Sequence, residues 1–279
     1  MHAQTFSMPS SAPLLRASVR PLLVAASLAL LSQAAAAQAF DAVRLYGAAP
    51  GKDGGVAGLA VVHGRDYAGS ASTRTMLVPL VDYQWANGWF AGVTNGVGYN
   101  FSRTPGLQYG LRVTADFGRK EKRSPVLRGL GDVDPSAEAG AFLNYSIDRE
   151  FFLTSSVRLG QGEDHRGALL DLGAGYSLEL APGWRLGAGV ATTLANADYL
   201  QTYFGVNATQ SAASGLRSYK PSAGLRDVRL NLSSTYRFDP RIGITTALSS
   251  TTLLGDAKDS PIVRKKNTIG AVVAVSYAF

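Results

Sequence analysis

The sequence predicts an all-β fold, a transmembrane antiparallel up-and-down β-barrel of about 12 strands. Three observations predict this class: long segments in which apolar and polar residues alternate, aromatic residues near the ends of these segments, and short turns that alternate with long loops. The segments run about 11 to 13 residues, longer than the roughly 5 or 6 usual in soluble strands and suited to a tilted strand that crosses hydrocarbon. Alternation alone also fits a soluble sandwich, so strand length and aromatic placement favour the barrel.

The N-terminus predicts a cleaved secretory signal peptide over residues 1–39, followed by one barrel domain over residues 40–279. Arg16 and Arg20 precede an apolar run over 22–31, and small residues follow it. The alternative is a transmembrane anchor, but a run of about ten apolar residues is shorter than the roughly 20 that span a bilayer. Cleavage would remove two arginines and no acid, which lowers the formal charge from +7 to +5.

The strand prediction begins with two irregular segments, 41–48 and 55–63, because the glycine-rich stretch Gly51–Gly55 lies between them. Counting both as strands makes 64–72 an unusually long turn on the periplasmic side. The predicted strands after it span 73–85, 89–101, 106–118, 136–147, 150–161, 167–179, 183–195, 224–238, 241–252 and 267–279.

Alternation is clearest in the segment 167–179. Leu170, Leu172 and Tyr176 would lie on one face of a strand, and Asp171 on the other. One face therefore suits lipid and the other suits water. The same pattern recurs in 106–118, 183–195, 224–238 and 267–279.

The connections between the predicted strands indicate that the two ends of the barrel differ. Short turns are expected on the periplasmic side and long loops on the opposite side, the usual asymmetry of outer-membrane barrels. The predicted turns include Asp148-Arg149, Ala181-Pro182 and Asp239-Pro240, and the predicted long loops are 119–135, 196–223 and 253–266. Aromatic residues near the strand ends would form interfacial girdles. They are Tyr83, Trp85, Trp89, Phe90, Phe117, Phe151, Trp184, Tyr236 and Phe238.

The last segment ends the chain on an alternating strand with an aromatic residue. Ile269, Val273 and Tyr277 share a face with the terminal Phe279. A C-terminal aromatic that closes such a strand resembles the signal by which the barrel-assembly machinery recognises its clients. Tyr277 and Phe279 are therefore the expected assembly signal, and that machinery is an expected partner.

Charged residues on the polar faces are predicted to lie in the lumen. They could form a pore lining that selects solutes by charge, or opposite charges could pair and fill the lumen. A barrel of about 12 strands is narrower than the roughly 16 to 18 strands of open porins, which favours the filled lumen. The predicted lumen charges are Arg112, Asp116, Arg158, Asp171, Glu179, Arg185, Arg229 and Arg237, with Glu138 and Asp227 beside them.

The sequence predicts no enzyme, no cofactor and no metal site. His165 shares a short charged loop with Glu163 and Asp164, but no G-x-S-x-G nucleophile motif accompanies it. The acidic stretch Gly129–Asp134 lacks the following Lys-Ser/Thr of a phosphate loop and the downstream Glu of an EF-hand, so an ordinary turn is expected. The chain has no cysteine, so neither disulfides nor thiolate zinc sites are expected.

Basic residues gather in two predicted loops, 119–123 and 264–266. Export makes nucleic acid an implausible partner. Contact with anionic headgroups of the outer leaflet is the better interpretation, so outer-membrane lipid and lipopolysaccharide are expected partners.

Several stretches, in order, resemble the MipA/OmpV family of outer-membrane proteins. Asp66–Ser70 reads D-Y-A-G-S where the family has D-Y-E-G-S, and Pro79–Tyr83 matches the pattern P-L-x-D-Y. Gly129–Asp134 followed by Glu138–Gly140 matches G-L-G-D-x-D and E-x-G, and Tyr203–Val206 begins a stretch similar to a long-loop motif. The resemblance covers most of the chain from about residue 55 to its end.

The resemblance implies a location in the cell outer membrane, reached through the periplasm of a Gram-negative cell. It also implies a scaffold that joins a lytic murein transglycosylase to a penicillin-binding synthase, and so a role in peptidoglycan metabolism. Such a role needs surfaces rather than catalytic residues, and no site residue is carried over. The alternative is a small-solute channel or a stress- or osmoregulated, porin-like surface protein.

Overall fold

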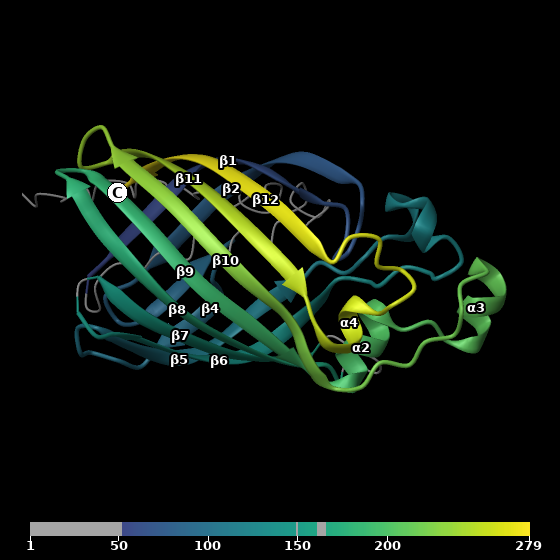
Figure 1. Cartoon of the computed structure of the whole chain (residues 1–279). Helices are drawn as coiled ribbons and strands as arrows, with labels where there is room; N and C mark the ends of the chain where they lie inside the picture. Colours follow the sequence, from purple (N-terminus) through teal and green to yellow (C-terminus); the bar gives the residue numbers. More distant parts are fainter. Residues whose placement is uncertain (1–51, 149, 161–165) are drawn as a thin grey trace, which may run out of the picture. The chain divides into compact units, whose positions relative to one another are not determined.

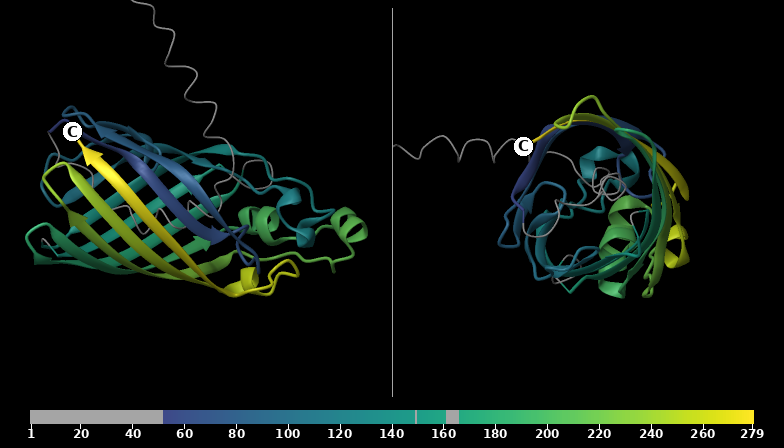
Figure 2. Two further views of the ribbon diagram at one scale, coloured as in Figure 1. Left: turned by 90° about the horizontal axis from the view of Figure 1, so that it is seen from above. Right: turned by 90° about the vertical axis from the view of Figure 1, so that its left-hand side faces the viewer.

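The computed structural model describes residues 52–148, 150–160 and 166–279, and these form a closed barrel of twelve antiparallel strands (Figure 1). Each strand pairs with its neighbours in sequence, and β1 closes the ring against β12 from Val56–Ala278 to His63–Ala271. Figure 2, on the right, looks along the strands and shows this ring. The predicted signal peptide and the predicted strand 41–48 lie outside the described residues. No helix within the described ranges is long and apolar enough to cross a bilayer.

The fold-class prediction is confirmed, and most strands lie close to their predicted positions. The strands are β1 (Gly54–Arg65), β2 (Thr73–Gln84), β3 (Trp89–Gly92), β4 (Gly96–Asn100), β5 (Leu107–Asp116), β6 (Ser136–Ser146), β7 (Phe151–Leu159), β8 (Ala168–Ala181), β9 (Trp184–Ala195), β10 (Gly224–Arg237), β11 (Ile242–Leu253) and β12 (Asn267–Ala278).

One predicted strand, 89–101, is wrong: it is a hairpin of two short strands, β3 and β4. The turn contains Asn95-Gly96, and Gly96 has the left-handed φ of 74° that a residue with a side chain rarely adopts. A Cβ at Gly96 would also lie 2.1 Å from the carbonyl oxygen of Val113 on β5. Asn-Gly between apolar residues is a strong hairpin signal, and it was present in the sequence.

The two ends of the barrel differ as predicted. Short turns at 85–88, 182–183 and 238–241 lie at the end that also holds the C-terminus, here called the turn end. The longer connections lie at the other end, here called the loop end, and they include 66–72, 117–135, 196–223 and 254–266. The placement of 64–72 among the periplasmic turns is therefore wrong. The reason is that the hairpin turn at 93–95 reverses the chain once more than predicted.

The outer face of the wall is apolar. Leu77, Leu230 and Ile269 are 67%, 60% and 65% exposed, which suits side chains that meet lipid rather than water. Exposed aromatic residues gather towards the turn end as one girdle: Trp85, Trp89, Phe101, Tyr109, Tyr145, Tyr176, Trp184, Tyr236, Phe238, Tyr277 and Phe279. Phe90 does not join this girdle as predicted, because it lies beside Phe142 and lines an inner cavity.

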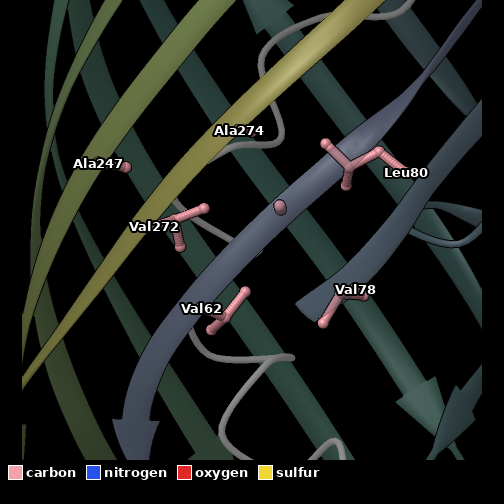
Figure 3. Packing of buried hydrophobic residues seen from close by; sticks show 7 residues of the cluster. Val62, Val78, Leu80, Ala247, Val272 and Ala274 are labelled. Carbon is pink, nitrogen blue, oxygen red and sulfur yellow. The ribbon is translucent and has the colours of Figure 1, made fainter. Parts of the chain in front are cut away.

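One sector of the inner face is apolar. Seven side chains of β1, β2, β11 and β12 form a cluster in which no member is more than 7% exposed. Figure 3 shows six of them by name on neighbouring strands: Val62, Val78, Leu80, Ala247, Val272 and Ala274. The charged residues considered below lie elsewhere on the inner wall.

Helices occur in the loops of the loop end. They are η2 (Glu121–Arg123), η3 (Pro125–Leu127), α2 (Ala197–Phe204), α3 (Ala208–Ser214) and α4 (Gly255–Lys258). Asn196 caps α2 by accepting from Tyr199 N at 3.0 Å, and it also accepts from Ala168 N at the start of β8. Asn207 and Gln210 form a reciprocal capping box on α3. The predicted loop 196–223 is therefore largely folded.

Candidate functional site

A line of buried charges crosses the inner wall on β6, β7, β8 and β10. Asp171 lies at its centre: its carboxylate accepts from Arg158 Nε at 3.0 Å and from Thr193 Oγ1 at 2.6 Å. Arg229 Nη2 approaches the same carboxylate at 3.5 Å. The Asp171 carboxylate on β8 thus links β7 on one side with β9 and β10 on the other.

The line extends in both directions from Asp171. Arg158 also pairs with Glu138, 2.9 Å away, whose side chain is only 2% exposed. Arg229 also pairs with Asp227 at 3.4 Å, and Asp227 accepts from Arg226 at 2.5 Å. Three arginines therefore alternate with three acids, so that each buried charge has a partner of opposite sign.

Arg226 joins this line because of a β-bulge. The pairing of β10 with β9 shifts between Leu225 and Asp227, so Arg226 is an extra residue in β10. It donates to the hydroxyl of Tyr199 on α2 at 3.0 Å and thereby ties the inner wall to the loop end. Strict alternation would instead place it on the outer face with Leu230. A charged residue at a position of the apolar, outward-facing face is unfavourable, and this was the sequence signal for the bulge.

The structure brings together only some of the predicted lumen charges. Arg158, Asp171 and Arg229 belong to the line described above. Arg112 lies apart, 7% exposed, donating to Ser156 Oγ at 2.8 Å with its guanidinium 5.8 Å from the Phe142 ring centroid.

The other predicted charges lie near the two ends. Asp116 accepts a hydrogen bond from Tyr203 of α2 at the loop end. Glu179 and Arg185 form an exposed pair at 3.2 Å near the turn end. Arg237 is exposed at the end of β10 and also lies at the turn end.

Two inner cavities flank these charges. A cavity of about 180 Å³ is lined by Arg112, Asp171, Arg229 and Asn231, among other residues. A much larger one, about 960 Å³ and here called the vestibule, lies towards the turn end and is lined by charged residues that include Glu179, Arg185, Arg237 and Arg241. The larger of these two cavities therefore lies at the turn end.

The loop end has hydrophobic cores of its own. Leu127, Val206 and Ile262 come from three loops and pack with Tyr67 of a fourth, and each is at most 3% exposed. The Tyr67 hydroxyl donates to the carbonyl of Ile262 at 2.9 Å. A second core packs Leu200 and Phe204 of α2 against β8, β9 and β11, with members that include Leu169, Ala195 and Leu253. These loops together are here called the cap.

The acidic stretch Gly129–Asp134 serves as a connection inside the cap. Glu121 accepts from the backbone N–H groups of Gly129 and Gly131, each at 2.9 Å. Lys120 bridges Asp132 and Asp134 at 3.1 and 2.7 Å. The hydrogen bond that the Glu121 N–H donates to Asp132, followed by the contact with Lys120, lowers the pKa of Asp132. Among the described residues no set of three potential metal ligands gathers. The charged loop Glu163-Asp164-His165 lies outside the described residues.

The basic stretch 119–123 does not present all of its charges to the surface. Arg119 is only 2% exposed, and its Nη1 donates to the carbonyl of Tyr203 at 2.8 Å. Burial lowers the pKa of this guanidinium. Contact of Arg119 with lipid headgroups, expected from the sequence, is therefore wrong, because the side chain lies inside the cap.

The C-terminal aromatics lie on the outer face of β12. Tyr277 and Phe279 are 42% and 58% exposed, and the Phe279 ring stacks on Tyr83 of β2 with centroids 6.0 Å apart. The backbone of Phe279 exchanges two hydrogen bonds with Gly55 of β1, at 2.9 and 3.0 Å. The last residue thus lies at the seam that closes the barrel, and its role in assembly stays a prediction.

Comparison with known proteins identifies a family. A family model described as MltA-interacting protein MipA matches residues 57–279. The MltA-interacting proteins of Escherichia coli strain K12 and of Shigella flexneri are each 27% identical over 208 residues, covering 72% of this chain and 81% of theirs. Among solved structures, the NanC porin matches with a TM-score of 0.47 at 12% identity, covering 78% of this chain and 98% of its own. The KdgM porin matches with a TM-score of 0.43 at 9% identity, covering 80% and 99%.

Proposed function

Because this chain belongs to the family of MltA-interacting protein MipA, we propose that it is a non-catalytic outer-membrane barrel that presents its turn end to a protein partner in the periplasm. The contrast between the two ends of the barrel carries this proposal. The cap has its own buried cores, whereas the turn end opens into a vestibule of about 960 Å³.

The asymmetry of the connections supports this orientation. Outer-membrane barrels have short turns in the periplasm and longer loops outside the cell. The aromatic girdle marks one interface of the hydrocarbon band near the short turns, and the apolar outer wall supplies the band itself. Cleavage of residues 1–39 during export is part of the same proposal.

The contacts of the inner wall favour a role in protein interaction over a role in solute transport. The alternating charges from Glu138 to Arg226 are paired with one another, which braces the wall across four strands. Arg226 also contacts Tyr199 of the cap, so that the wall and the cap hold each other in place. A solute passing from the vestibule would therefore meet packed loops.

The two relatives are named for an interaction with MltA. For this chain we propose a partner of the same class, a lytic murein transglycosylase, together with the penicillin-binding synthase that the family resemblance implies. The exposed charges at the rim of the vestibule, Glu179, Arg185, Arg237 and Arg241, are the proposed contact surface.

Affinity capture from solubilised envelopes tests this proposal. The mature protein should retain a murein hydrolase or synthase identified by mass spectrometry. The double variant Glu179→Lys/Arg237→Glu should lose it, while Lys258→Glu on α4 at the loop end should retain it. Equal retention by all three proteins would refute the turn-end surface, and loss by both variants would place the contact elsewhere.

A second candidate function is a small-solute channel. The observation in its favour is the cavity of about 180 Å³, whose lining holds Arg112 and Arg229 with Asp171 and several amide and hydroxyl groups. With two arginines against one aspartate, such a lining would prefer anionic solutes. Current recording in planar bilayers separates the two functions, because a capped barrel gives no conductance steps.

A further inference from the structure

Three phenylalanines of the inner wall each lie directly opposite a glycine on the neighbouring strand. The pairs are Phe90 with Gly98 on β3 and β4, Phe142 with Gly110 on β6 and β5, and Phe152 with Gly175 on β7 and β8. A Cβ on any of these glycines would lie 2.1 to 2.8 Å from the tip of the opposite ring. Glycine therefore leaves the space in which each half-buried ring lies across the neighbouring strand.

The three rings line inner cavities that adjoin one another. Phe90 and Phe142 line a cavity of about 350 Å³, and Phe142 and Phe152 line the cavity of about 180 Å³. Phe152 also lines the vestibule, and Asn95 lines all three spaces. A path therefore runs from the vestibule past the three rings to β3, and it is here called the aromatic path.

Side-chain amides lie between the rings of the aromatic path. Gln108 and Asn144 are paired across β5 and β6, and both line the two smaller cavities. Asn144 lies two residues from Phe142, on the same face of β6. Its partner on β7 is Thr154, which lies two residues from Phe152. Within the described residues, neither the Gln108 nor the Asn144 side chain forms a hydrogen bond, so their donors and acceptors are open to a ligand.

The charged side chains of the cavity of about 350 Å³ offset each other. Among the described side chains that line it, Asp82 is the one acid and Arg112 the one base. Both are held by the wall, because Asp82 accepts from Thr94 Oγ1 at 2.6 Å and Arg112 donates to Ser156 Oγ at 2.8 Å. The side chains of this cavity therefore do not select for a strongly charged ligand.

Aromatic rings that alternate with amides match the chemistry of a sugar. One face of a pyranose ring carries C–H groups, whose weakly positive hydrogens are attracted to the negative face of an aromatic ring. The hydroxyl groups at its edge donate and accept hydrogen bonds, as a side-chain amide does. An acyl chain would contact the rings but leave the amides of Gln108 and Asn144 without partners, which is unfavourable. An extended peptide could bind the amides, but its backbone has no flat C–H face to lie on the rings.

We propose that the aromatic path binds an oligosaccharide, which enters through the vestibule at the turn end. Its sugar rings lie on Phe90, Phe142 and Phe152. Its hydroxyl or acetamido groups form hydrogen bonds with Gln108 and Asn144. The inference goes beyond the partner interaction proposed above and does not depend on it, because the path lies on the inner wall and the proposed contact surface lies on the rim.

Isothermal titration calorimetry on the refolded protein, in a detergent without a sugar headgroup, tests the site. The probes are the tetramers of N-acetylglucosamine and of glucose, and at least one of them should bind the unmodified protein. Phe142→Leu keeps an apolar side chain but removes the aromatic face, and it should weaken binding roughly tenfold. Asn144→Leu should also weaken it roughly tenfold, because the sugar loses a hydrogen-bond partner. Phe101→Leu makes the matched change on the outer face, where Phe101 is 47% exposed, and should leave the affinity unchanged.

Heat-modifiable mobility on gels shows which variants are folded. Asn144→Leu removes no hydrogen bond between described residues, so it tests the site even if Phe142→Leu does not fold. The inference is wrong if neither tetramer binds, or if binding is the same in the unmodified protein and in both inner-wall variants. Binding of tetraalanine in place of the saccharides, weakened by the same variants, would show that the path takes a peptide and would also overturn the inference.

Discussion

The loop end and the turn end of this barrel are built by different means. At the loop end, four connections bring Leu127, Val206 and Ile262 together into a core that water does not reach. At the turn end, connections of a few residues are held mainly by single aspartates: Asp148 accepts from Phe151 N at 2.6 Å, and Asp239 accepts from Ile242 N at 2.8 Å. One end is a packed structure that substitutions can loosen, and the other is a rim to which we propose that a partner binds.

Loosening the cap should have the largest effect. Phe204 is 1% exposed in the core under α2, and Phe204→Ala should destabilise the cap by about 3–5 kcal/mol. Limited proteolysis should then cut within 196–223 while the barrel keeps its heat-modifiable mobility on gels. The matched change at the turn end, Phe238→Ala, removes a side chain that is 65% exposed and should leave the cap resistant. Equal resistance of Phe204→Ala and the unmodified protein would show that the cap does not depend on this core.

Removing the charge at the centre of the inner wall should have the next largest effect. Asp171→Asn leaves Arg158 and Arg229 with one carboxylate partner each, and we expect a loss of about 3 kcal/mol in urea unfolding from vesicles. Glu179→Gln is the control at the turn end, because its pair with Arg185 is exposed and contributes at most about 1 kcal/mol. Similar losses for the two variants would mean that the buried line of charges contributes no more to the free energy of unfolding than a surface pair does.

Deleting Phe279 should affect assembly more than stability. A partly buried apolar side chain contributes about 1.5–3 kcal/mol at most, and Phe279 is 58% exposed. If the residue is an assembly signal, the deletion should reduce the heat-modifiable form in cells while refolding in detergent stays near normal. Normal assembly in cells would remove that role, and failure in both settings would show that the contacts with Tyr83 and Gly55 matter through stability.

The smallest effect should come from the aspartates of the turn end. Backbone N–H groups lower the pKa of Asp148 and of Asp239. A lowered folded-state pKa stabilises the fold above the ordinary pKa near 4 and ceases to do so as pH falls through the lowered value. The melting-temperature difference between the unmodified protein and Asp239→Asn should therefore be present in full at neutral pH, begin to shrink near pH 4 and be lost as the pH falls through the lowered pKa of Asp239. A difference that is constant with pH would exclude this explanation.

The wall could be predicted from the sequence because alternation with a period of two acts at every position of a strand. Most strand positions and the three long loops follow from it. Two exceptions are local: the turn at Asn95-Gly96 and the bulge at Arg226 change the direction of the chain or of one side chain. Each had a signal in the sequence. The Asn-Gly pair indicates the turn, and a charged residue at a position of the apolar face indicates the bulge.

The cap could not be predicted in the same way. Its cores join residues far apart in sequence, such as Tyr67 and Ile262, and no periodicity links them. Asn196 and Asn207 are residues that commonly begin a helix, so the starts of α2 and α3 had a signal in the sequence. The contacts that hold these helices in place depend on the barrel beneath and had none. The line of buried charges was predicted in part, because Asp171 lies on the polar face of an alternating strand. Arg226 was not predicted, because it reaches the inner face only through the bulge in β10.

Single-channel recording in planar bilayers tests most directly the claim that the cap closes one end of the barrel. The unmodified protein, refolded and inserted, should give no discrete conductance steps, and Phe204→Ala should give intermittent ones as the cap loosens. Stable steps from the unmodified protein would contradict the account, because they would show an open path between the vestibule and the loop end.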